Sequence, residues 1–148
     1  MATPDAHALA AAQIDRYLME RALREAGADG APRATSLPVI TISRTVGIPG
    51  TEIARKVADE LGFHFLDRQV LDAVAQDAHL GKKVIASLDE GSLSALDSWF
   101  QGLVDYGRRM VDPQSFHHML SRVIRGISHH GNAVILGRGA NFILRGTD

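Results

Sequence analysis

Two glycines and two polar side chains stand between a short apolar run and an amphipathic segment, in a pattern typical of phosphate binding. The turn contains Gly47 and Gly50, and it is preceded by Arg44 and followed by Thr51. In a strand–turn–helix arrangement, the backbone N–H groups of such a turn and the positive end of the helix together attract an anion. Arg44 would add positive charge, and Thr51 would add a hydroxyl group. These four residues are the first candidates for a binding site.

The turn departs from the standard phosphate-binding loop, which reads G-x-x-x-x-G-K-S/T. Aligned on Gly47 and on the helix register, the pattern places its first glycine on Arg44 and its second glycine on Pro49. Its lysine falls on Gly50, so the charge that neutralises phosphate oxygens is absent, and Pro49 removes one N–H donor from the loop. From the residues alone, a phosphate site and an ordinary tight turn between a strand and a helix both remain open.

The histidines in the second half of the chain occur in adjacent pairs, which are poorly placed to share a metal ion. The pairs are His117–His118 and His129–His130. Neighbouring residues on a helix point to different faces, and no two histidines four residues apart accompany a carboxylate ligand. We therefore predict no metal site formed by these side chains.

The composition is that of an ordinary globular protein. The chain has 148 residues, which favours one domain, with 45% hydrophobic and 22% charged residues. The net charge of −1 gives no electrostatic argument for nucleic acid or for an anionic membrane surface. The absence of cysteine excludes disulfides, cysteine-ligated zinc and thiol catalysis. No apolar run approaches the length of a membrane span and no basic signal-peptide region is present, so we expect a cytoplasmic protein.

Short apolar runs alternate with helical patterns along the chain, which predicts an α/β fold. Strands are expected at 38–42, 63–66 and 132–137; helices are expected before Gly62, at 69–78, 82–88 and 92–110, and from Pro113 to about His130. Short strands separated by helices favour parallel pairing through right-handed crossovers.

The segment that precedes the first strand is predicted to be a helical appendage. Residues 6–26 are rich in alanine and carry a partial apolar stripe, formed by Leu9, Ile14, Leu18, Ala22 and Leu23. Residues 28–36 have the composition of a linker. We therefore divide the chain into a helix and linker at 1–36 and a main domain at 37–148. The helix must dock either on its own domain or on a second subunit, and we favour the second subunit.

Several stretches of the chain coincide, in order and spacing, with a known family pattern. They read ITISR followed by the glycine turn and EIARKVADELG, then FLDRQVL, then NAVILGRGANFIL. Together they resemble the cytidylate kinase-like family, a divergent branch of the P-loop nucleoside monophosphate kinases, over Leu37 to about Leu144. The resemblance implies a parallel sheet with flanking helices. It also implies ATP-dependent phosphorylation of a nucleotide, CMP or dCMP, with ATP and Mg²⁺ as cofactors.

The resemblance assigns the glycine turn to the donor nucleotide. It places Gly47, Gly50 and Thr51 in the loop that holds the ATP phosphates. The branch commonly lacks the loop lysine and carries an arginine before the loop, which draws attention to Arg44.

A second group of residues falls on the monophosphate side of the family pattern. Asp67 and Arg68 lie on the substrate arm, and Arg138 would contact the acceptor phosphate and is the expected catalytic residue. A planar guanidinium binds phosphate through two hydrogen bonds, and phosphoryl transfer depends on positioning and charge neutralisation. The alternatives are a helix cap with solvated charge for Asp67 and Arg68, and a surface arginine for Arg138.

The chain also departs from the family pattern in two ways. Pro49 stands where the family has glycine, and the chain stops where the family continues into another strand, an arginine-bearing lid and a final strand. We therefore expect a P-loop-like sheet that is incomplete at its C-terminus. Whether the chain turns over substrate, or is an inactive nucleotide-binding or helical interaction module, stays open. The strand at 38–42 would then be an exposed apolar edge, which favours a homo-oligomer.

Overall fold

A parallel three-stranded sheet lies at the centre of the part of the chain that the computed structural model describes, which is residues 5–26, 38–86 and 113–146. The strands are β1 (Val39–Ile42), β2 (His64–Leu66) and β3 (Ala133–Leu136). Their order is β1-β3-β2 and both pairings are parallel, so β3 is the central strand. The predicted α/β class with a parallel sheet is confirmed.

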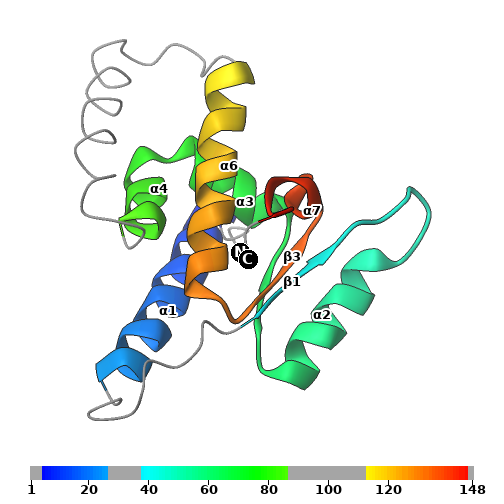
Figure 1. Cartoon of the computed structure of the whole chain (residues 1–148), viewed down its shortest axis with the longest axis horizontal. Helices are drawn as coiled ribbons and strands as arrows, with labels where there is room; N and C mark the ends of the chain where they lie inside the picture. Colours follow the sequence, from blue (N-terminus) through cyan, green and yellow to red (C-terminus); the bar gives the residue numbers. More distant parts are fainter. Residues whose placement is uncertain (1–4, 27–37, 87–112, 147–148) are drawn as a thin grey trace.

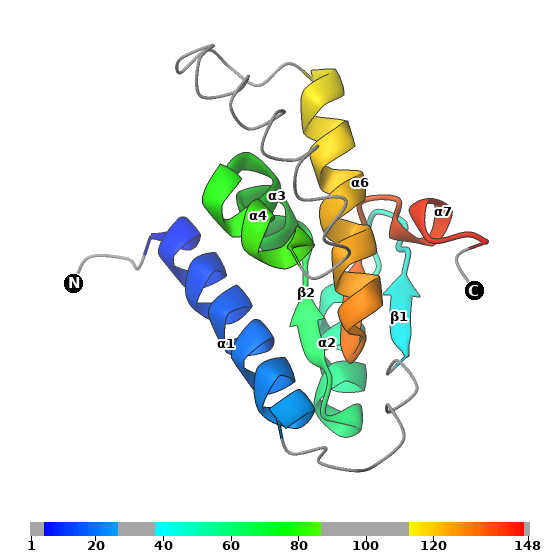
Figure 2. The same cartoon turned by 60° about the vertical axis from the view of Figure 1, so that its left-hand side comes forward.

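Helices cover both faces of this sheet (Figures 1 and 2). The helices are α1 (Ala6–Ala26), α2 (Gly50–Leu61), α3 (Arg68–Gln76), α4 (Ala78–Ile85), α6 (Pro113–His130) and the short α7 (Ala140–Ile143). Helix α2 packs on one face, while α1, α3, α4 and α6 share a larger apolar core with the other face. The helix predicted at 92–110 and the linker predicted at 28–36 lie outside the described residues.

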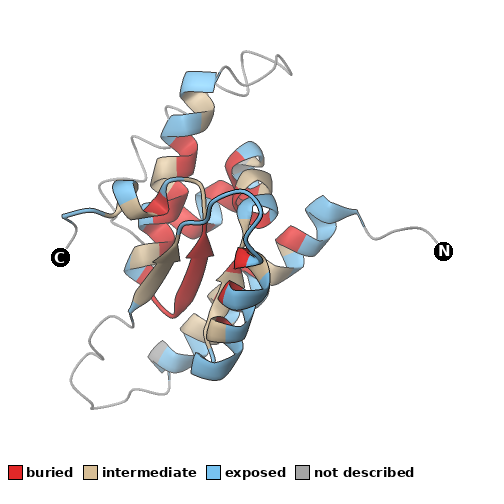
Figure 3. Cartoon of the chain, turned by 90° about the vertical axis from the view of Figure 1, so that its right-hand side faces the viewer, coloured by how far each residue is buried: buried red, intermediate tan, exposed pale blue. Residues whose placement is uncertain are grey.

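The central strand is buried along its whole length. Ala133 and Ile135 face the larger core, and Val134 and Leu136 face α2. Figure 3 shows this buried strand beside partly exposed neighbours. Continuous burial on both faces explains why the sequence here reads as an uninterrupted apolar run.

Helix α1 docks on its own domain, in contrast to the subunit contact that the sequence favoured. Tyr17 is fully buried against the core, and its hydroxyl lies 2.7 Å from the Gly131 carbonyl oxygen and 3.1 Å from that of Ile127. Leu9 and Leu23, which belong to the predicted stripe, are more than half exposed. The stripe was partly right, because Ile14 is buried and Leu18 packs against the core. It omitted Tyr17, whose buried hydroxyl is satisfied by carbonyls at the end of α6, far away in sequence.

Helix α4 begins four residues earlier than the sequence predicted. The Asp77 carboxylate accepts hydrogen bonds from the N–H groups of His79, at 2.8 Å, and Leu80, at 3.0 Å. This cap separates α3 from α4, so the predicted helices at 69–78 and 82–88 become Arg68–Gln76 and Ala78–Ile85.

The Asp77 cap predicts a pH-dependent contribution to stability. Burial alone would raise the pKa of Asp77, but hydrogen bonds from the N–H groups of Leu80 and His79, together with the nearby His7 side chain, outweigh it and lower that pKa below its usual value. Because the folded-state pKa is the lower one, the carboxylate stabilises the fold above its unfolded-state pKa. That stabilisation is lost as the pH falls through the folded-state pKa.

We expect Asp77→Ala to lower the free energy of unfolding by about 1 kcal/mol near neutral pH. In acid, below the carboxyl pKa, the difference from wild type should shrink. Urea unfolding at the two pH values measures this, with Asp59→Ala on the exposed face of α2 as the control. An Asp77→Ala deficit of equal size at both pH values would contradict the prediction.

Candidate functional site

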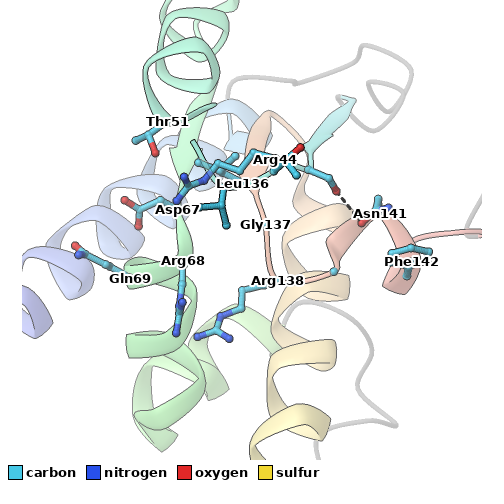
Figure 4. A pocket seen from close by; sticks show the side chains of 14 residues that line it. Arg44, Thr51, Asp67, Arg68, Gln69, Leu136, Gly137, Arg138, Asn141 and Phe142 are labelled. Carbon is cyan, nitrogen blue, oxygen red and sulfur yellow. Dashed lines mark hydrogen bonds between the residues drawn. The ribbon is translucent and has the colours of Figure 1, made fainter. Parts of the chain in front are cut away.

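A cavity of about 780 Å³ opens at the carboxyl ends of the three strands (Figure 4). Its walls come from the segments that follow β1, β2 and β3, together with the first turn of α2. The lining residues are 43–46, Thr51, 67–69, 136–139, Asn141 and Phe142. The carboxyl edge of a parallel sheet is where open α/β proteins bind their ligands, so this cavity is the candidate site.

The cavity brings together five of the seven residues that the sequence singled out. They are Arg44, Thr51, Asp67, Arg68 and Arg138, and they come from three separate segments of the chain. The two glycines, Gly47 and Gly50, belong to the loop after β1 but do not line the cavity.

Gly50 is required by the side chain of Arg44. A Cβ atom on Gly50 would lie 2.7 Å from Arg44 Cδ and 2.9 Å from Arg44 Cβ, which is closer than real contacts allow. Gly47 adopts a left-handed backbone conformation, with φ of 91° and open space around it. Gly50 thus lets Arg44 cross the start of α2, and Gly47 lets the chain turn before it.

Two N–H groups of this loop bond within the loop itself. The Gly50 N–H donates to the Ile48 carbonyl at 2.7 Å, and the Ile48 N–H reaches the Thr45 carbonyl at 3.4 Å. Pro49 precedes α2 and has no N–H to offer. The loop therefore differs from one that presents all of its N–H groups to a phosphate.

Arg138 occupies an unusual backbone conformation directly after β3. Its φ of 53° is left-handed, and it stands between Gly137 and Gly139, with φ of 82° and 67°. A residue other than glycine pays about 1 kcal/mol or more for this conformation. The guanidinium lies 5.8 Å from the centre of the Phe116 ring and donates from Nη2 to Oδ2 of Asp72.

Asp72 is a residue that the sequence reasoning missed. Its Oδ2 accepts from Arg138 and also lies 3.5 Å from Nε of Arg68, one helical turn earlier on α3. The spacing of Arg68 and Asp72 on one helix was visible in the sequence. The contact with Arg138, 66 residues away, was not.

Asp67 has a structural contact besides its place in the cavity. Its carboxylate accepts a hydrogen bond at 3.1 Å from the Val70 N–H and caps α3, which is the alternative that the sequence offered. Across the cavity, the Ser43 hydroxyl donates to the side-chain oxygen of Asn141 at 3.1 Å, which ties the end of β1 to α7. This tie was also missed, because a hydrogen bond between distant loops leaves no local pattern.

The cavity wall carries excess positive charge. Arg44, Arg68 and Arg138 line it against a single carboxylate, that of Asp67. Within the described residues, no group of three or more histidine, cysteine, aspartate or glutamate side chains is placed to hold a metal ion. In the same part of the chain, no helix is long and apolar enough to span a membrane. The donor set therefore suits an anion with several oxygen atoms, such as a phosphate group.

A family model for the cytidylate kinase-like family matches residues 39–148, which is most of the chain. The chain belongs to this family. The match contains all three strands and every residue that lines the cavity, so the cytidylate kinase-like part of the chain is the part that forms the site. No curated protein and no solved structure was found to match the chain. Membership in the cytidylate kinase-like family indicates a nucleotide kinase-like function.

The close approach of Gly50 and Arg44 predicts the effect of a single methyl group. Gly50→Ala should lower the free energy of unfolding by about 1–3 kcal/mol. The added Cβ would clash with Cβ and Cδ of Arg44 and force that side chain to move. Urea unfolding measures this loss of stability. In a chain that already carries Arg44→Gly, adding Gly50→Ala should cost much less, because the clashing side chain is absent. A Gly50→Ala chain as stable as wild type would show that this contact does not constrain the loop.

Proposed function

We propose that this chain binds a nucleoside monophosphate, CMP or dCMP, and that its family's reaction is phosphoryl transfer from ATP to that nucleotide. The observation that carries the proposal is the convergence of three arginines, from three separate segments, on one cavity at the carboxyl edge of the sheet. Phosphoryl transfer is catalysed mainly by holding the reactants in line and by neutralising charge on the transferred group. Guanidinium groups from different loops suit both tasks.

We assign the two sides of the cavity to the two nucleotides. Arg138, with Asp67 and Arg68, takes the acceptor phosphate. Arg44 and Thr51, at the start of α2, take the donor phosphates, where the positive end of the helix adds to their attraction. Mg²⁺ bound with the donor nucleotide would help to neutralise the charge of its phosphates, and the Thr51 hydroxyl is the side-chain group that would hold it.

A second candidate function is nucleotide binding without turnover. It is favoured by the loop after β1, where the N–H groups of Ile48 and Gly50 bond within the loop and Pro49 contributes none. A loop of this kind would hold the donor phosphates weakly while the arginine side of the cavity keeps its charge. Binding and turnover therefore have to be measured separately.

We expect calorimetric titration with CMP, and with ATP in the presence of Mg²⁺, to give saturable binding. Arg138→Ala should weaken CMP binding at least about tenfold, since a charge-assisted hydrogen bond contributes about 1.5–3 kcal/mol. Arg125→Ala, on an exposed position of α6, makes the same charge change away from the cavity and should leave affinity unchanged. ADP formation from CMP and ATP then separates a kinase from a binding protein.

Two results would count against the proposed site. Equal CMP affinity in wild type and Arg138→Ala would remove Arg138 from it. Absence of binding of either nucleotide at millimolar concentration would contradict the proposed function as a whole.

We further propose that the chain self-associates through β1 and works in the cytoplasm. In the described part of the chain, β1 pairs with β3 alone, so its other edge has no partner strand. Such an edge favours pairing with a second copy. Sedimentation at micromolar concentration should give a species larger than the monomer, and a monomer would contradict self-association.

A further inference from the structure

The carboxylate of Asp72 stands behind two arginines that line the cavity. Arg138 donates to its Oδ2, and Nε of Arg68 lies 3.5 Å from the same oxygen. Both arginines are among the lining residues and Asp72 is not. Figure 4 shows the side chains of Arg68 and Arg138 approaching one another from α3 and from the end of β3. One carboxylate thus contacts both guanidinium groups without itself facing the cavity.

Arg138 is restrained on its other sides as well. Its backbone adopts the left-handed conformation, and its guanidinium lies over the Phe116 ring of α6. Only 22% of its side chain is exposed, and its Nε finds no hydrogen-bond partner among the described residues. A guanidinium has five N–H donors. Asp72 therefore fixes the group through Nη2, and the terminal N–H donors that Asp72 does not use, rather than the buried Nε, remain for a ligand.

We propose that Asp72 is a positioning residue, which sets the direction of Arg138 so that its remaining donors meet a phosphate group beside the more exposed Arg68. This inference rests on the proposed function. Two guanidinium groups and one carboxylate leave a net positive charge, so the cluster still attracts an anion. Ordering a long side chain at the moment of binding costs entropy, and a carboxylate that orders it beforehand reduces that cost.

Removing the carboxylate has two opposing effects on phosphate binding. The cluster becomes more positive, which by itself strengthens the attraction for any anion. Arg138 also loses the charge-assisted hydrogen bond that fixes its direction, which weakens binding. If Asp72 positions Arg138, the second effect outweighs the first.

We therefore expect Asp72→Asn to weaken CMP binding by about three- to tenfold in calorimetric titration, although it removes a negative charge. Asp59→Asn makes the same charge change on the exposed face of α2 and serves as the matched control, with unchanged affinity. Unchanged or tighter binding in Asp72→Asn would overturn the proposal, because the carboxylate would then only reduce the positive charge of the site.

Asp72→Glu separates position from charge, and it also serves if Asp72→Asn fails to fold. This variant keeps the net charge and moves the carboxylate by one methylene group. We expect CMP affinity lower than that of wild type and ADP formation lowered with it. Affinity equal to that of wild type would overturn the proposal.

A double-mutant cycle tests whether Asp72 acts through Arg138. In the Arg138→Ala background, Asp72→Asn should cause little further loss of CMP affinity, because residues that act together are not additive. If Asp72→Asn lowers CMP affinity by the same factor in the Arg138→Ala background as in wild type, the proposal is overturned.

The mobility of Arg138 can be measured without any ligand. Nitrogen relaxation of its side-chain N–H signal, assigned by its loss in Arg138→Ala, should show a restricted group in wild type and in Asp59→Asn. It should show a mobile group in Asp72→Asn. Equal mobility in all of these chains would overturn the proposal. If the wild-type chain binds neither CMP nor ATP, only the proposed function is overturned. The relaxation measurement needs no ligand, so it would still decide whether Asp72 fixes Arg138.

Discussion

The arrangement of the site depends on the burial of β3 between two apolar layers. All four residues of this strand are buried, and it pairs in parallel with a strand on each side. Because parallel strands end at the same edge, the segments that follow β1, β2 and β3 emerge together. Arg44, Arg68 and Arg138 meet at one cavity for this reason, although they are far apart in the sequence.

Periodicity in the sequence was sufficient for the strands and most helices. The apolar runs at 38–42 and 132–137 correspond to β1 and β3, and Gly62 ends α2 in the left-handed conformation expected of a helix cap. Periodicity failed where a distant group satisfies a polar side chain. Tyr17 shows this, because its hydroxyl can be buried there only when a carbonyl at the end of α6 accepts its hydrogen bond.

The residues of the candidate site also fall into two groups, those in local sequence patterns and those that depend on distant contacts. Residues in local patterns could be selected from the sequence, such as Thr51 after its glycine turn and Asp67 before its helix. Asp72 could not, because its importance comes from a contact with Arg138 across 66 residues. Gly50 was selected from the sequence as part of a tight turn. The structure adds another reason for glycine at this position, because the close approach of Arg44 leaves no room for a side chain.

The backbone of Arg138 links this geometry to function. Three successive residues, 137–139, adopt left-handed conformations between β3 and α7, and glycine occupies the first and the last of them. Glycine at position 138 would avoid the conformational cost, so the arginine is there at the expense of stability. Strain of this kind persists where surrounding contacts hold it, and here the carboxylate of Asp72 and the ring of Phe116 do so. Arg138 is strained, is held by Asp72 and Phe116, and lines a cavity at the carboxyl edge of the sheet. A role in ligand binding explains this arrangement more simply than a role in folding.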